Sequence, residues 1–386
     1  MKKHLISIVF FFSFFVHSTA QQKNTCTFAT RQNRASMVKQ LRVQVDTVIQ
    51  LPLNSSTYTK YAGAYWAMEL MLYRPGGYEK IIHMQVLQLP LTDSGFQRDF
   101  LEMLYTLYPN QFARQLQSVW AQLGGDKVKA MALEYLARKN VFPEISRADH
   151  FFGSSYCRVY RERWKQKTKS LPLKQNFLDP SFLPGQTLLC SFQSINRNHP
   201  GYLMLRNEKG KWVTDTQGKP LRFPQLARSI SNLPYYLTNG NTPQGLYKIT
   251  GFDTSGNNWI GPTTNLQMVL PFENGPTEFF GMDTAYDAVY KNLLGPLAKY
   301  NSLAEAFEAG RLGRMEIIAH GTTIDPAFYK KQPYYPNTPS MGCLCSPELW
   351  NDRGERIYSA QSGWIQTMKK LAPPPGYLIV AEVRDL

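Results

Sequence analysis

The sequence has few acidic residues and only one long apolar run. Asp and Glu together number 28 against 43 Lys and Arg in 386 residues, so the formal charge is +15. Because the apolar run covers only residues 5–16, a protein with several membrane-spanning segments is excluded. With 43% apolar residues, and 25 prolines and 26 glycines spread along the chain, wholesale disorder, collagen and coiled coil are excluded as well. The length suggests two or three globular domains.

The apolar run at the N-terminus has the layout of a secretory signal peptide. Lys2 and Lys3 precede it, and the small residues at 18–20 follow it. A run this short is typical of a cleaved signal at 1–20 and not of a membrane anchor, which needs about 20 apolar residues. We therefore expect a periplasmic or secreted protein. Its basic charge favours peripheral association with polyanions of the cell envelope, and export makes nucleic acid the least expected partner.

Cysteine and histidine are scarce, which restricts any chemistry that uses them. An odd number of cysteines in an exported protein leaves at least one thiol outside an intramolecular disulfide, and two disulfides with one reactive thiol is a natural partition. The five cysteines are Cys26, Cys157, Cys190, Cys343 and Cys345. The histidines beyond the signal peptide are His83, His150, His199 and His320.

The hydrophobic pattern changes near the middle of the chain. Apolar residues recur every three or four positions over 100–136, which predicts helices and indicates a mainly helical domain of unknown role at 25–157. The segment 158–185 is basic and then proline-rich, which is typical of a linker. Beyond it, short apolar runs predict strands at 187–192, 202–206, 212–213, 246–250, 315–319 and 377–383, with a helical insertion at about 283–312. The predicted fold class is α+β, with the helical domain followed by a mainly β domain at 186–386.

The segment 315–346 carries the densest chemical signal. A predicted strand runs into His320-Gly321-Thr322, and a polar loop that contains Tyr335 leads to Ser340-Met341-Gly342-Cys343. A cysteine nucleophile needs a neighbour that promotes loss of its proton, together with N–H donors for the oxyanion. His320 and Cys343 fit the first need, and the glycine before the cysteine permits close approach to a substrate. There are alternatives to a catalytic pair. His320 is then an ordinary histidine at a strand end, and Cys343 and Cys345 are structural or redox cysteines. A metal site is not expected with a single nearby histidine.

These motifs together resemble the catalytic domain of the L,D-transpeptidases (YkuD type). That family has a mainly β fold and a motif of the form H-G, a loop, then [ST]-x-G-C, as in 320–322 and 340–343 of this chain. It also carries a T-P-x-G segment before a strand, as in Thr242-Pro243-Gln244-Gly245, and a strand where this chain has 227–231. The resemblance covers roughly residues 186–350. Many members have histidine in place of Met341 and arginine or asparagine in place of Cys345, and one branch that includes hydrolases also lacks the arginine.

The resemblance implies an exported cysteine enzyme that acts on peptidoglycan stem peptides without a metal or other cofactor. Cys343 attacks a carbonyl beside a diamino acid, His320 acts as the base, and the Gly342 and Cys343 N–H groups bind the oxyanion. Ser340 contacts His320 or shapes the loop. The residues expected around the substrate are Gly321, Thr322, Met341 and Tyr335. An acceptor amine resolves the thioester to a crosslink, whereas water makes the protein a carboxypeptidase or a peptidoglycan–protein amidase. A non-catalytic peptidoglycan-binding protein and another exported cysteine hydrolase or sortase-like transferase are the alternatives.

Overall fold

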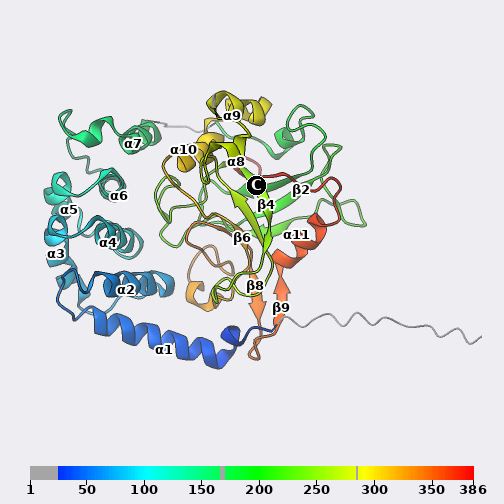
Figure 1. Ribbon diagram of the computed structural model, residues 1–386. Helices are drawn as coiled ribbons and strands as arrows, with labels where there is room; N and C mark the ends of the chain where they lie inside the picture. The colour runs from blue at the N-terminus through cyan, green and yellow to red at the C-terminus, as the bar shows by residue number, and fades with distance from the viewer. Residues whose placement is uncertain (1–24, 166–169, 284–285) are drawn as a thin grey trace, which may run out of the picture.

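The computed structural model describes residues 25–165, 170–283 and 286–386, so the predicted signal peptide at 1–20 lies outside the described residues. Helices and one large mixed sheet are both present, which confirms the α+β class. In Figure 1 the helices of the first half stand beside the strand-rich second half. No helix in the described ranges is both long enough and apolar enough to cross a bilayer.

The predicted helical pattern of the first half is confirmed. Asp93 begins α4 by accepting a hydrogen bond from the Phe96 N–H at 2.8 Å, which satisfies one of the free donors of the first turn. The last helix of this half covers the start of the segment predicted as a linker, so its first basic residues are helical. The helices are α1 (Arg31–Val48), α2 (Tyr58–Met71), α3 (Tyr78–Gln88), α4 (Ser94–Leu107), α5 (Ala113–Val119), α6 (Asp126–Ala137) and α7 (Ser155–Lys165).

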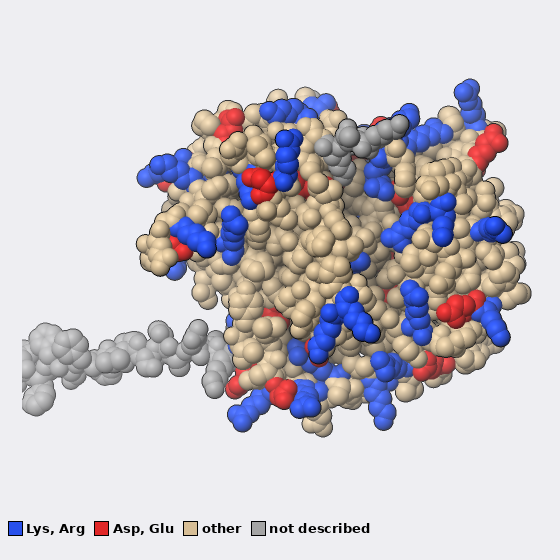
Figure 2. Space-filling view, turned by 180° about the vertical axis from the view of Figure 1, so that it is seen from behind, with Lys and Arg blue, Asp and Glu red and all other residues tan. Residues whose placement is uncertain are grey.

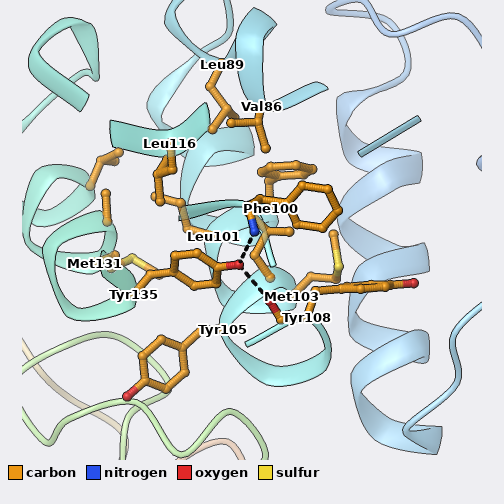
Figure 3. Packing of buried hydrophobic residues seen from close by; sticks show 14 of the residues in the cluster. Val86, Leu89, Phe100, Leu101, Met103, Tyr105, Tyr108, Leu116, Met131 and Tyr135 are labelled. Atoms are coloured by element: carbon orange, nitrogen blue, oxygen red, sulfur yellow. Dashed lines mark hydrogen bonds between the residues drawn. The ribbon is translucent and has the colours of Figure 1, made fainter. Parts of the chain in front are cut away.

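A large aromatic core holds these helices together (Figure 3). Tyr135 lies fully buried in it, where its hydroxyl accepts from the Phe112 N–H at 3.1 Å and donates to the Tyr108 carbonyl at 2.7 Å. The ring therefore contributes apolar area while its polar tip stays satisfied. The same core includes Tyr236, which comes from the second half of the chain and donates to Glu134 at 2.8 Å. The two halves thus share buried contacts.

The second half is organised around a nearly closed sheet. Its strand order is β3-β2-β1-β10-β4-β5-β6-β7, and the pairs β1–β10 and β6–β7 are parallel while the others are antiparallel. Leu226 follows β3 directly and exchanges backbone hydrogen bonds of 2.8 and 2.9 Å with Cys345 of β7, which brings the two edges together. The strands are β1 (Leu188–Gln193), β2 (Gly201–Arg206), β3 (Phe223–Gln225), β4 (Gly245–Asp253), β5 (Asn265–Val269), β6 (Ala319–His320), β7 (Leu344–Cys345) and β10 (Tyr377–Glu382).

Helices cover both faces of this sheet. The segment between β5 and β6 forms α8 (Pro276–Phe280), α9 (Tyr286–Leu294) and α10 (Glu305–Arg311), whose aromatic residues pack against β1 and β4. On the other face, α11 (Ala360–Met368) packs through Trp364. A small hairpin, β8 (Glu348–Trp350) with β9 (Arg356–Ser359), completes the structure. The predicted insertion at 283–312 therefore corresponds to helices α9 and α10.

Two of the strand predictions differ from the structure. The predicted strand at 315–319 is reduced to the two residues of β6, because Glu316 adopts a left-handed backbone conformation with φ of 59°, which interrupts an extended chain. The predicted strand at 212–213 forms only an isolated bridge, between Trp212 and Arg206. The predictions that correspond to β1, β2, β4 and β10 are confirmed.

The start of the described chain is attached to the turn of the β8–β9 hairpin. The Cys26 N–H donates to the Gly354 carbonyl at 2.7 Å, and the Arg31 N–H donates to the Asp352 carbonyl at 3.1 Å. Figure 1 shows α1 running from this hairpin toward the other helices. The helical half therefore contacts the strand-rich half at this hairpin as well as through the shared core.

Candidate active site

Strands β6 and β7 bring the two predicted catalytic segments side by side. They pair in parallel, with Ala319 opposite Leu344 and His320 opposite Cys345. Ala319 and Leu344 belong to the apolar core on one face of the sheet, so alternation directs His320 and Cys345 to the other face. Cys343 lies one residue before β7. The residue in register with His320 is therefore Cys345, two positions beyond the predicted nucleophile.

A set of short hydrogen bonds shapes the loop that carries Cys343. The Ser340 hydroxyl donates to the Cys343 carbonyl at 2.8 Å and accepts from the Gly342 N–H at 3.1 Å. Two roles were predicted for Ser340, to contact His320 or to shape the loop. Its hydrogen bonds lie within the loop, and none reaches His320 within the described chain. The Gly342 N–H is occupied by Ser340, whereas the Cys343 N–H has no hydrogen-bond partner among the described residues and is free to bind an oxyanion.

The upstream motifs meet at the same loop. The Thr242 hydroxyl, from the T-P-x-G segment, donates to the Gly342 carbonyl at 2.8 Å. The Ile230 N–H, from the segment at 227–231, donates to the Ser340 carbonyl at 2.7 Å. Segments about 100 residues apart in the sequence therefore converge on the four residues 340–343.

The surroundings of the Cys343 thiol favour its protonated form. It is half-buried and donates a hydrogen bond to the Glu316 carbonyl at 3.5 Å. Burial raises the pKa of the Cys343 thiol above its ordinary value, although the Ile318 N–H and the guanidinium of Arg314 act in the opposite direction. Some further change at the site is needed before this sulfur acts as a strong nucleophile.

Arg314 is a site residue that the sequence did not reveal. Its buried guanidinium donates to the carbonyls of Tyr235 at 2.6 Å and Leu237 at 2.7 Å, and it lies against Gly342. A positive charge at this position favours a thiolate at Cys343. No motif points to Arg314, since it lies 29 positions before the cysteine in an unremarkable stretch of sequence. Arg314 reaches the loop only in the folded protein, where its guanidinium lies against Gly342.

His320 has the protonation state that a general base requires. Its Nδ1 lies 2.5 Å from the Gly321 carbonyl, and because a carbonyl can only accept, Nδ1 carries the proton and Nε2 is left with its lone pair. Burial lowers the pKa of His320, with a smaller opposing effect of the Gly321 carbonyl, so the ring is neutral at pH 7. No hydrogen bond joins the ring to Cys343 in the described chain.

Gly321 and Thr322 pack against a buried carboxylate, Glu348. The Thr322 N–H donates to Glu348 at 3.0 Å, Thr263 donates at 2.7 Å, and Arg356 lies 3.6 Å away. A Cβ atom on Gly321 would collide with the Glu348 carboxylate, which explains the glycine. The structure thus gives both residues a supporting role under His320, and Glu348 was missed because a lone glutamate in sequence carries no signal.

Met341 and Tyr335 are the exposed members of the predicted substrate set, at 48% and 45% exposure. Met341 borders a recess that α2 and α4 line with Glu69 and Glu102. Burial raises the pKa of Glu102 to about 7, and the Asn239 amide donates to it at 2.9 Å. The helical half therefore forms one wall of the recess beside Met341, two residues before Cys343.

The five cysteines are all free, so the partition into two disulfides and one thiol does not hold in this structure. Cys345 is buried with its sulfur 3.6 Å from the Thr338 hydroxyl, and burial raises the pKa of its thiol to about 12. This cysteine is accordingly an inert neighbour of Cys343. Among the described residues, no group of three or more His, Cys, Asp and Glu side chains is arranged to hold a metal ion.

Comparison of the chain with protein-family models, with curated proteins and with solved structures gave no match. The functional argument therefore depends on the residues and on their geometry.

Proposed function

We propose that this protein is an exported cysteine enzyme of the L,D-transpeptidase type that acts on peptidoglycan stem peptides. The observation that carries the proposal is the convergence of separate sequence motifs on one loop. Thr242 and Ile230 both hydrogen-bond to residues 340–343, and β7, which follows that loop, pairs with the strand that ends in His320. In this proposal residues 186–386 are the catalytic domain, and the helices of 25–157 form a wall of the substrate groove.

The proposed reaction begins with transfer of the Cys343 thiol proton to Nε2 of His320. The sulfur attacks a carbonyl of the stem peptide, and the Cys343 N–H stabilises the oxyanion. The carbon–nitrogen bond then breaks, His320 returns the proton to the leaving amine, and a thioester forms. An acceptor amine, or water, attacks the thioester and restores the thiol. Because no hydrogen bond joins the ring and the thiol here, substrate binding must bring Nε2 and Sγ into contact.

A second candidate function is favoured by the state of the thiol. The Cys343 thiol donates to the Glu316 carbonyl at 3.5 Å and makes no hydrogen bond to His320 in the described chain, and burial raises its pKa. A protein that binds peptidoglycan without turnover needs no activated sulfur. In this candidate function the recess beside Met341 binds peptidoglycan, and Cys343 only packs against its neighbours.

Digestion of purified sacculi separates the two candidates. The wild type is compared with Cys343→Ala under reducing conditions, and the released muropeptides are analysed by mass spectrometry. Cys345→Ser is the matched control, because it alters the neighbouring buried sulfur while the serine hydroxyl still has Thr338 within reach. We expect altered stem peptides with the wild type and with Cys345→Ser, and none with Cys343→Ala.

The masses also distinguish the reactions. A gain of crosslinked species indicates transfer to an amine, and a loss of residues with uptake of water indicates hydrolysis. Identical muropeptides from all three proteins, with wild-type protein still sedimenting with sacculi, would establish the non-catalytic binder and end the enzyme proposal.

A further inference from the structure

Three arginines line one cavity between the helices and the sheet. The cavity measures about 420 Å³, which is within the range of small-ligand sites. Arg74 lies between α2 and α3, Arg138 directly follows α6, and Arg228 follows β3. Positive charge is elsewhere spread across the surface, as Figure 2 shows for one face, whereas these three side chains share a single space.

No carboxylate neutralises this arginine cavity. None of the three arginines forms an ion pair within the described ranges, and none of the residues lining the cavity is acidic. The residues outside those ranges, 1–24, 166–169 and 284–285, contain no Asp or Glu. Within the described ranges the three guanidinium groups are therefore not paired with a carboxylate, and the buried Glu69 accepts instead from Thr106 at 3.0 Å.

Hydrogen bonds hold Arg138 and Arg228 but leave N–H donors available, and Arg74 is exposed. Arg228 donates through Nε to Asn198 at 2.7 Å and through Nη1 to the Ser229 carbonyl at 2.6 Å, and its Nη2 has no hydrogen-bond partner among the described residues. Arg138 donates through Nη1 to the Tyr105 carbonyl at 2.8 Å and also hydrogen-bonds to the Tyr105 side chain. Arg74 makes no hydrogen bond in the described chain.

Aromatic rings fix the positions of the same three groups. The Arg228 guanidinium lies 4.6 Å from the centre of the Tyr334 ring, and that of Arg138 lies 3.6 Å from the centre of the Tyr105 ring. Arg74 lies 5.2 Å from the centre of a third ring, Tyr108. Stacked arginines lose less side-chain entropy when they bind, so the site is preorganised.

The guanidinium groups of Arg138 and Arg228 repel each other across the arginine cavity. Burial lowers the pKa of the Arg228 guanidinium, and the positive charge of Arg138 lowers it further, against the opposing effect of the tyrosines nearby. An anion between these groups offsets their mutual repulsion and accepts hydrogen bonds from guanidinium N–H groups that no described residue accepts.

We propose that the arginine cavity is a binding site for a compact oxyanion group, a carboxylate or a phosphate. Arginine matches both groups through paired N–H donors. An anion bound there contacts the helices and the 228–232 segment at once, and so links the two halves of the molecule. The site does not use Cys343, and the proposal is independent of the peptidoglycan chemistry.

Isothermal titration calorimetry on the full chain tests this site with two probes, citrate for carboxylates and pyrophosphate for phosphates, at one fixed ionic strength. We expect Arg74→Gln and Arg138→Gln each to weaken binding of the better probe at least tenfold. Arg222→Gln is the matched control, because Arg222 is an exposed arginine that also lies over a ring, Tyr202 at 4.9 Å, but does not line the cavity. It should weaken binding less than twofold.

Each outcome decides the proposal. Tighter binding of citrate assigns the site to carboxylates, and tighter binding of pyrophosphate assigns it to phosphates. The absence of binding by both probes overturns the proposal, as does an equal loss in Arg222→Gln, which would indicate attraction by net charge alone. If Arg138→Gln fails to fold, Arg74→Gln decides, since that side chain makes no hydrogen bond in the described chain. Cys343→Ala should bind the probes like the wild type, which keeps this test separate from the enzyme assay.

Discussion

Replacing Gly342 with alanine tests the packing of the candidate active-site loop. Gly342 has a φ of 116°, a conformation that residues with a side chain rarely adopt. A Cβ atom there would lie 2.6 Å from Nη2 of Arg314 and 2.7 Å from the carbonyl oxygen of Gly240. Both distances are shorter than a carbon atom tolerates, and one of the atoms belongs to the backbone.

The expected loss of stability follows from these two effects. An unfavourable backbone conformation costs about 1–3 kcal/mol, and forcing extra volume into a packed site costs about 1–3 kcal/mol more. We therefore expect Gly342→Ala to lower the free energy of unfolding by about 2–6 kcal/mol. That loss is a large part of the total stability of an ordinary domain. Because Arg314 must move, the proposed turnover of peptidoglycan should fall as well.

Urea denaturation followed by circular dichroism measures this change, and Gly256→Ala is the matched control. Gly256 is exposed, its φ is not in the left-handed region, and a Cβ atom there meets nothing within 4 Å. The control should shift the free energy of unfolding by no more than about 0.5 kcal/mol. A Gly342→Ala protein as stable as Gly256→Ala would refute the described contact between the loop and Arg314.

Three further predictions concern the charges and thiols of the molecule. In the proposed enzyme the neutral His320 ring is the base, and burial lowers its pKa below its ordinary 6.5, so the acid-side decline of kcat/KM should have its midpoint below pH 6.5; a midpoint above 6.5 contradicts this reasoning. Tyr236→Phe removes the 2.8 Å hydrogen bond to the buried Glu134 and should cost about 1–3 kcal/mol in urea denaturation; an unchanged midpoint argues against the bond. The raised pKa of the Cys343 thiol predicts slow alkylation by iodoacetamide at pH 7 that accelerates toward pH 9, measured by peptide mapping with Cys26 as the internal reference; rapid alkylation at pH 7 indicates a thiolate.

Some features of the fold are local enough to be predicted from sequence. The period of apolar residues over 100–136 indicates helices, because burial of one face requires that spacing whatever the face packs against. Short apolar runs such as 377–383 likewise indicate strands. The sequence pattern did not predict that Glu316 interrupts a strand, because a left-handed residue outside glycine is imposed by contacts from distant segments.

Some residues of the candidate site can likewise be predicted from sequence, and others cannot. The residue types at 320 and 343 and the glycine before the cysteine are visible in sequence, because the chemistry of a nucleophile needs those groups. Arg314 and Glu348 are not visible, since each acts through its position beside a loop that is remote in the chain. Whether His320 meets Cys343 or Cys345 is a matter of strand register, which pairing between β6 and β7 decides.

The sequence by itself determined the α+β class, the helical and strand-rich halves and the set of groups able to do cysteine chemistry. Those features depend on composition and on short-range periodicity. Only the tertiary structure decided which charges are unpaired and which thiols are buried. It also decided that the helices share a core with the sheet and enclose an arginine cavity against it. The physical reason is that burial and electrostatic pairing are set by residues brought together from across the whole chain.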